Sequence, residues 1–195
     1  VVEWDGWLDG FYEEHIGWMT GYLGPVFGSY ANLVVGELEE ETGAEAAAAD
    51  VQAFLEPYTA SRARVYGARH KAEVKGAAAE AQAAGEDPQA AVEAAVAKLQ
   101  EEEAERFAED ESVRLGNALA RAMLPLLGML RLMWVAYGDN CEYCQGLDGR
   151  VVGASSWFLG EGESMTDSAG VVFQPGSNVG HPPLHRGCDC MVVGA

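Results

Sequence analysis

Large apolar residues recur every three or four positions through the first forty residues, which is the spacing of one face of a helix. Gly24 and Pro25 interrupt this pattern, so we expect a first helix, which already includes Val1, to end there and a second helix to start at Pro25 and to precede the acidic run Glu39-Glu40-Glu41. The first helix is rich in aromatic residues, which suits either a packed core or a docking surface for another chain. Its apolar positions are Trp7, Leu8, Phe11, Tyr12, Ile16, Trp18, Met19 and Tyr22.

Capping signals divide the next part of the chain. The string Thr42-Gly43-Ala44-Glu45 fits a capping box, which predicts a third helix that ends near Glu56, before Pro57. Residues 59–84 are rich in Ala, Arg, Glu and Lys and predict a thinly packed helix. Gly85 should stop that helix, and Asp87 followed by Pro88 should cap and start the next one.

A last long helix is expected to open at Asp110 or Ser112 and to run to Trp134. Pro125 would remove a backbone donor inside it, so we expect a kink near residues 121–125. After Gly138, glycine, serine and β-branched residues replace alanine, which indicates a change from helix to strand. Three short strands are predicted at Arg150–Val152, Val171–Phe173 and Met191–Val193.

These elements predict an α+β chain with enough apolar material, at 49 % of residues, to bury a core. We expect residues 1–110 to form a helical region whose apolar faces dock onto a larger assembly, and residues 111–195 to form the long Pro-kinked helix with a small Cys/His-clamped β module. The chain begins at Val1 within a predicted helix, as expected for a fragment of a longer polypeptide or a processed form, and no signal peptide is visible. The apolar stretch 118–137 contains Arg121, Pro125 and Arg131, which predicts a buried helix and no membrane anchor.

The net charge of -19 disfavours autonomous DNA binding, because an acidic surface repels phosphate backbones. Most acids fall in Glu/Ala-rich stretches and are expected on solvated helix faces. An acidic wall beside a path taken by DNA would also keep the polymer from sticking. A binding-class alternative is local contact with DNA through the one basic cluster, which comprises Arg62, Arg64, Arg69, His70, Lys71 and Lys75.

All four cysteines lie in the last segment, as Cys141-Glu142-Tyr143-Cys144 and as His185-Arg186-Gly187-Cys188-Asp189-Cys190. A CxxC turn presents two sulfurs to one point, and HxxCxC offers a nitrogen and further sulfurs, so together they supply the ligands of a tetrahedral zinc site. A segment with little core would gain stability from such a structural zinc. The predicted metal ligands are Cys141, Cys144, His185, Cys188 and Cys190.

Other chemistry remains open for the same residues. Cys141 or Cys144 can form disulfides with Cys188 or Cys190 in an oxidising environment, and all four can stay free thiols in a reducing one. His181 is a further candidate ligand. A catalytic zinc would need an open position and a nearby acid or base. The acids that sequence places near enough are Asp139, Glu142, Asp148 and Asp189.

The order of motifs from Trp134 to Val152, with CxxC and then Leu147-Asp148-Gly149, resembles the signature of the phage Mu protein F-like family. The closing Pro182-Pro183-Leu184-His185-Arg186-Gly187-Cys188-Asp189-Cys190 is similar to that family's Pro-x-His-x-x-Cys-x-Cys ending. Asn117 and Ala120 in the preceding helix also fit. The resemblance covers residues 112–194, and it departs at Asp189, where the family usually has Arg.

The resemblance implies a structural minor head protein and no enzyme. It implies association with the portal protein or the major capsid protein of a phage or prophage-derived particle, several copies per particle, and a role in head assembly, DNA packaging or delivery. Such a protein is made in the host cytoplasm and located in the virion, in the head interior or at the portal vertex. Some relatives are fused to a portal protein, and others carry toxin domains, so a metal-dependent hydrolase or toxin-like domain is the enzyme-class alternative.

Overall fold

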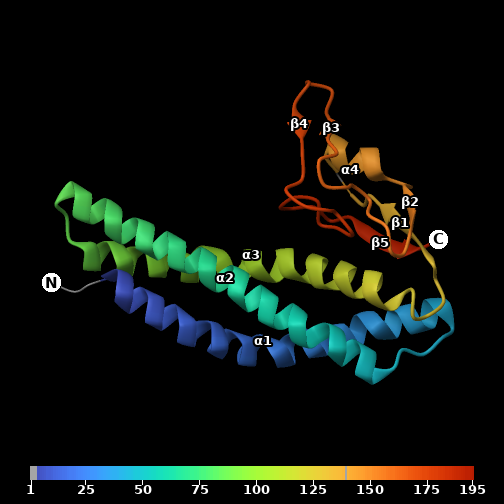
Figure 1. Cartoon of the computed structure of the whole chain (residues 1–195), viewed down its shortest axis with the longest axis horizontal. Coiled ribbons are helices and arrows are strands. Elements are labelled where there is room, and N and C mark those ends of the chain that lie inside the picture. The colour runs from blue at the N-terminus through green and yellow to red at the C-terminus, as the bar shows by residue number, and fades with distance from the viewer. Residues whose placement is uncertain (1–3, 139) are drawn as a thin grey trace. The chain divides into compact units, whose positions relative to one another are not determined.

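The computed structural model of the chain describes residues 4–138 and 140–195. Three long helices, α1 (Trp4–Thr42), α2 (Ala48–Ala84) and α3 (Pro88–Met123), precede a small β module that contains one short helix, α4 (Glu142–Leu147) (Figure 1). The predicted α+β fold class is therefore confirmed. The strands are β1 (Arg131–Val135), β2 (Val151–Gly153), β3 (Met165–Thr166), β4 (Val172–Phe173) and β5 (Met191–Gly194).

Two compact units make up the chain, and each draws on separate stretches of sequence. The first contains residues up to Gly28 together with Leu55–Ala108, and the second contains Ser29–Phe54 together with Glu109–Ala195. The predicted boundary between residues 1–110 and 111–195 falls inside α3, which is continuous there. The hydroxyl of Ser112 donates to the carbonyl of Glu109 within this helix (2.8 Å), so Ser112 does not open a new one.

The predicted helix breaks at Pro25 and Pro57 are wrong, because α1 and α2 both continue through their prolines. A proline inside a helix leaves the carbonyl four residues earlier without its usual donor. Those carbonyls belong to Gly21 and Ala53, and both residues are exposed, so water can satisfy them. Placement on the outer face therefore makes each proline tolerable.

The predicted capping box at Thr42 is also wrong, because this residue ends α1 and α2 begins only at Ala48. The Thr42 hydroxyl donates backward to the carbonyl of Leu38 (2.7 Å), and Gly43 adopts a left-handed φ of 69°, which is a helix C-terminal geometry. The start of α3 is as predicted: the Asp87 carboxylate accepts a hydrogen bond from the N–H of Gln89 (3.0 Å) directly ahead of Pro88.

The prediction of one long Pro-kinked helix is wrong for its second half. α3 ends at Met123, and the chain reverses through residues 124–128, where Gly128 has a φ of 94°. Arg131–Val135 then forms strand β1, in which Leu132 and Trp134 are fully buried and Arg131 is exposed. Pro125 therefore lies in a turn between helix and strand, and it ends the helix instead of kinking it.

β1 is the centre of a three-stranded antiparallel sheet with the order β2-β1-β5. Trp134 lies opposite Val192 of β5, and Leu132 lies opposite Val152 of β2. β3 and β4 form a separate two-stranded hairpin. The strands β2, β4 and β5 begin and end within a residue or so of their predicted positions, whereas β1, β3 and α4 were not predicted.

Small residues allow the helices of the first unit to approach closely. Its buried cluster combines Leu8 and Tyr12 of α1 with Val74 and Ala78 of α2, and with Val92 and Ala95 of α3. At Gly67, a Cβ atom would lie 2.5 Å from Cγ1 of Ile16, so α1 and α2 leave no room for a side chain there. Asp9 of α1 accepts from Lys71 and Lys75 of α2 at 2.6 Å and 2.8 Å.

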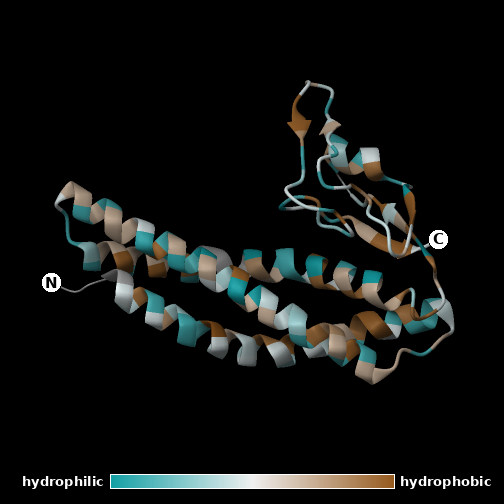
Figure 2. Ribbon diagram, in the orientation of Figure 1, coloured by the Kyte–Doolittle hydropathy of each residue, from teal (hydrophilic) through white to brown (hydrophobic). Residues whose placement is uncertain are grey.

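Hydrophobic and hydrophilic residues alternate along α1, α2 and α3 (Figure 2). Over residues 4–138 and 140–195, none of the helices combines the length and the apolar character that a bilayer crossing would demand.

We predict that Gly67→Ala lowers the free energy of unfolding by about 1–3 kcal/mol, because the added methyl group overlaps Ile16. Gly76 provides the matched control: it is an interior glycine of the same helix with open space around its Cβ position, so Gly76→Ala should be neutral or stabilising by up to about 1 kcal/mol. Urea unfolding followed by circular dichroism measures both. Equal effects of the two changes would show that Gly67 marks no close helix contact.

Candidate metal centre

The CxxC motif is placed by the short helix α4. Cys141 immediately precedes the helix in an extended conformation, and Cys144 lies in its first turn. The N–H of Gln145 donates to the carbonyl of Cys141 (3.0 Å), which closes the turn and sends both sulfurs to one side. Cys144 is fully buried and Cys141 is partly exposed.

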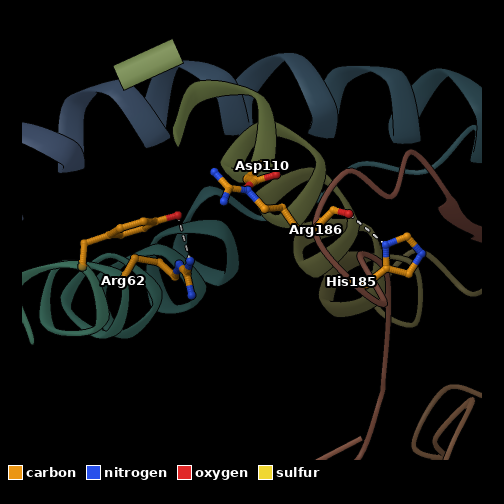
Figure 3. A network of polar contacts seen from close by, with 5 residues as sticks. Arg62, Asp110, His185 and Arg186 are labelled. Atoms are coloured by element: carbon orange, nitrogen blue, oxygen red, sulfur yellow. Dashed lines mark hydrogen bonds and ion pairs between the residues drawn. The ribbon is translucent and has the colours of Figure 1, made fainter. Parts of the chain in front are cut away.

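The HxxCxC motif approaches from a loop that turns at Gly187, whose φ of 70° favours glycine. Nδ1 of His185 lies 2.8 Å from the carbonyl oxygen of Arg186, as Figure 3 shows. A proton on Nδ1 donated to that carbonyl leaves Nε2 as the free nitrogen that can bind a metal. The Arg186 guanidinium in turn lies 3.6 Å from the carboxylate of Asp110 on α3.

The two motifs meet at Cys144. Nε2 of His185 lies 2.9 Å from the sulfur of Cys141 and 3.4 Å from that of Cys144. The sulfurs of Cys144 and Cys188 are 3.6 Å apart. The five predicted ligands therefore form two overlapping triads, Cys141–Cys144–His185 and Cys144–Cys188–Cys190, and within each triad all ligand atoms lie within 4.8 Å of one another.

Two of these three separations fit a metal ion bound by sulfur and nitrogen, whereas the 2.9 Å between Cys141 and His185 is shorter than the spacing of neighbouring ligands. In a tetrahedral zinc site with bonds of about 2.0–2.3 Å, neighbouring ligand atoms lie about 3.3–3.8 Å apart. The Cys144–His185 and Cys144–Cys188 distances fall in that range. The Cys144–Cys188 separation is also well beyond a disulfide bond of about 2.05 Å. The cluster can hold a metal ion, with Cys144 common to both triads.

Burial sets the protonation of these groups. Burial and the neighbouring Cys188 raise the pKa of the Cys144 thiol, and burial and Cys188 likewise raise the pKa of Cys190. Burial alone would raise the pKa of Cys141, but the backbone of Cys144 and the ring of His185 bring it below its ordinary value. A metal that binds here must therefore displace protons from Cys144 and Cys190.

α3 holds the HxxCxC segment against the rest of the second unit. The Asn117 side chain donates to the carbonyl of Cys190 (3.0 Å) and accepts from the N–H of Val192 (2.7 Å), and it is buried. One turn later, Arg121 donates to the carbonyls of Gly180 (2.6 Å) and Ser156 (2.7 Å). Asn117 was noticed in the sequence only through the family resemblance, and Arg121 only as an interruption of an apolar stretch.

The small core of the β module lies next to the sulfurs. The rings of Trp134 and Phe158 meet edge to face with centroids 5.3 Å apart, and both are fully buried. The indole N–H of Trp134 has no hydrogen-bond partner of ordinary geometry, and its proximity to Cys190 counteracts part of the increase in the pKa of that thiol. It is thus a buried donor beside a sulfur that would carry negative charge in a metal site.

The structure does not bring the remaining candidates into the cluster. His181 is excluded from both triads, and its Nδ1 lies 2.5 Å from the carbonyl of Pro182. The Glu142 carboxylate accepts from the backbone and the hydroxyl of Ser168, and that of Asp148 accepts from the N–H of Ala136 (2.8 Å). Asp189 lines an exposed hollow, and Asp139 lies outside the described residues.

The hollow that contains Asp189 has a volume of about 430 Å³ and reaches Cys188. Glu109 and Asp110 of α3 also line it. Three carboxylates at the edge of the cluster favour the approach of a cation and disfavour that of a phosphate group.

The basic cluster in the first unit is partly neutralised. Lys71 and Lys75 both bind Asp9, and these hydrogen bonds lower the pKa of its carboxyl group. The Arg62 guanidinium stacks over the ring of Tyr66 at 4.9 Å. The Asp9 carboxylate offsets one of the two lysine charges that would be available for a phosphate backbone, whereas Arg62 keeps its charge.

Comparisons of the chain with known protein families, with curated proteins and with solved structures found no match.

We predict that Asn117→Ala destabilises the second unit by about 2–4 kcal/mol, because it leaves a buried carbonyl at Cys190 and a buried N–H at Val192 without partners. Hydrogen exchange of the Val192 amide should accelerate in parallel. Asn178 is the control, because its side chain accepts one exposed bond from Glu161, and Asn178→Ala should cost less than about 1 kcal/mol. Unchanged exchange at Val192 would contradict the role given to Asn117.

Proposed function

We propose that this chain is a structural minor head protein of a phage or prophage-derived particle, and that its C-terminal module is stabilised by one structural zinc ion. The observation that carries the metal proposal is the meeting of CxxC and HxxCxC at Cys144, across more than forty residues of sequence. A chance pair of motifs would not be expected to place five soft ligands around a shared position.

Thiolate and imidazole ligands favour zinc over magnesium or calcium, which prefer oxygen ligands. The set also favours a structural role over a catalytic one. Five candidate donors compete for four positions, so the protein can close the coordination shell without a bound water. In addition, Glu142 and Asp148, which a hydrolytic site would need as acid or base, are committed to hydrogen bonds with the backbone.

The proposed role in the phage head rests on the resemblance of residues 112–194 to the Mu F-like family. The convergence of that family's two cysteine motifs supports the resemblance physically. The acidic composition agrees with a protein that lies near packaged DNA without binding it. The portal protein or the major capsid protein would be its partner, and the virion its location.

We predict one zinc ion per chain in protein purified under reducing conditions, as measured by elemental analysis. Cys144→Ser should weaken zinc binding and lower the zinc content, because both triads lose their shared member. Chelation of the wild-type protein should lower the melting temperature of the second unit, because metal binding to the folded state adds to its stability.

His181→Ala is the matched control, since His181 lies in neither triad, and this variant should keep its zinc. If the purified protein lacks both zinc and titratable thiols, the cysteines form disulfides and the metal proposal is wrong. Full zinc occupancy in Cys144→Ser would remove Cys144 from the site.

The role in the particle requires a separate test. In a phage that encodes this chain, we expect gradient-purified heads to contain it in several copies, as detected by quantitative mass spectrometry. Phage carrying Cys144→Ser should yield fewer DNA-filled heads, whereas His181→Ala should not change the yield. Absence of the chain from both procapsids and mature heads would rule out a head protein, whatever the metal content.

A further inference from the structure

α1 carries a continuous stack of aromatic rings on its surface, which we call the ladder. Successive rings are 5.4–5.5 Å apart between centroids, and their planes differ by only 11–16°. Between 45 % and 63 % of Trp7, Phe11, Trp18 and Tyr22 remains exposed, although each ring stacks on its neighbour. The ladder consists of Trp7, Phe11, His15, Trp18 and Tyr22.

Glycines form a second line beside the ladder, which we call the stripe. It consists of Gly6, Gly10, Gly17 and Gly21, and each of these directly precedes a ladder aromatic. All four are exposed, and a Cβ atom at any of them would meet nothing within 4 Å. The fold of the chain itself therefore gives no reason for glycine at these helix positions, where glycine is a poor helix former.

We propose that a second copy of this chain packs on α1, with the ladder of one copy lying along the stripe of the other. Each copy offers both surfaces, and the shared 4-7-4 spacing of the two sets puts every stripe glycine at the level of a ladder aromatic when two α1 helices run parallel. Ladder and stripe are neighbours separated by about 100° around the helix, because consecutive residues differ by that angle.

Because the stripe glycines have no side chains, the α1 helix of a second copy can approach this surface closely. A glycine stripe lets a facing helix approach until its rings touch backbone, which no other residue permits. The stacked rings are also already ordered along α1, so less conformational freedom is lost when they dock. Both features suit an interface, and in the isolated chain only Trp18 and Tyr22 of the ladder also line an apolar hollow among the described residues of the first unit.

The area is sufficient for a stable contact. Four aromatic side chains about half exposed offer roughly 400 Å² of surface, since each buries on the order of 200 Å² when covered. A comparable area of helix is covered on the facing stripe. When each copy uses both its ladder and its stripe, the total exceeds the roughly 1,000 Å² that a specific interface needs.

Charge opposes this association, which makes the salt dependence informative. The chain carries a net charge of -19, and the exposed Glu13 and Glu14 lie between Phe11 and His15 in the sequence of α1. Added salt screens repulsion between like charges and strengthens apolar contacts. Association through the ladder should therefore strengthen with salt, whereas contact with DNA through basic residues should weaken.

Sedimentation equilibrium of the full chain over a wide concentration range tests the proposal. We expect a mass above that of the monomer, and more association in high salt. The double change Gly10→Gln and Gly17→Gln should raise the dissociation constant by roughly tenfold or more, because side chains then fill the stripe. The same variant should unfold at an equal or higher temperature, because glutamine forms helix better than glycine.

Gly76→Gln is the matched control, since it also fills open space at an interior helical glycine but lies on α2. It should leave the dissociation constant unchanged. A wild-type chain that stays monomeric at all concentrations and salt levels overturns the proposal and leaves the ladder to a different protein. Association that the stripe variant and the control weaken equally would overturn it as well. The outcome does not depend on the metal content or on the proposed role in the particle.

Discussion

The attachment of the chain's last residues to α3 is the contact on which the C-terminal module depends. Asn117 binds both the carbonyl of Cys190 and the N–H of Val192, so one buried side chain fixes the end of the HxxCxC motif and the start of β5. β5 then pairs with β1, which puts Val192 opposite Trp134. Asp110 and Arg121, which are seven residues before and four after Asn117, hold further loops from the same side of α3. The sulfur cluster and the sheet are thus positioned by the same helix face.

This arrangement creates an electrostatic problem that only a few states of the cysteines can solve. The thiols of Cys144, Cys188 and Cys190 are buried together, and burial disfavours their negative forms, as the raised pKa values of Cys144 and Cys190 indicate. The thiols can remain protonated or pair as disulfides. They can also release their protons to solvent and bind a cation that neutralises the resulting thiolates. Nε2 of His185, which lies against the sulfurs of Cys141 and Cys144, adds a ligand atom that a disulfide would not use. That nitrogen and the sulfurs together are a donor set that could hold a metal ion.

The sequence predicted the composition of this cluster but little of what holds it in place. Cysteine and histidine spacing is a local signal, and the structure brought all five predicted residues together. The anchors Asn117 and Arg121 look like ordinary helix residues, because their roles come from segments 35 or more residues away. Strand β1 was hidden for a related reason. Its alternation of buried Leu132 and Trp134 with Arg131 lies within a longer apolar run that also fits a helix.

The prolines also show that a local sequence signal does not by itself determine where a helix ends. Pro25, Pro57 and Pro125 are equivalent as local signals, yet only Pro125 coincides with the end of a helix. Pro25 and Pro57 lie on exposed faces, where water can bind the carbonyl that each one leaves free. Pro125 is followed within three residues by Gly128, whose left-handed conformation reverses the chain toward β1. A proline therefore ends a helix here only where the next residues also favour a turn.

The exposure of the ladder follows from how the first unit packs. α2 and α3 meet α1 largely through alanine and valine, and at Gly67 through no side chain at all, so little space remains between the helices for large side chains. Leu8 and Tyr12 fill the space that remains. Trp7, Phe11, Trp18 and Tyr22 must then lie on the flank of α1, where they cover one another only in part. Close packing of the helices thus favours small residues in the core and leaves several aromatic rings on the surface. Exposure of this apolar area to water is unfavourable.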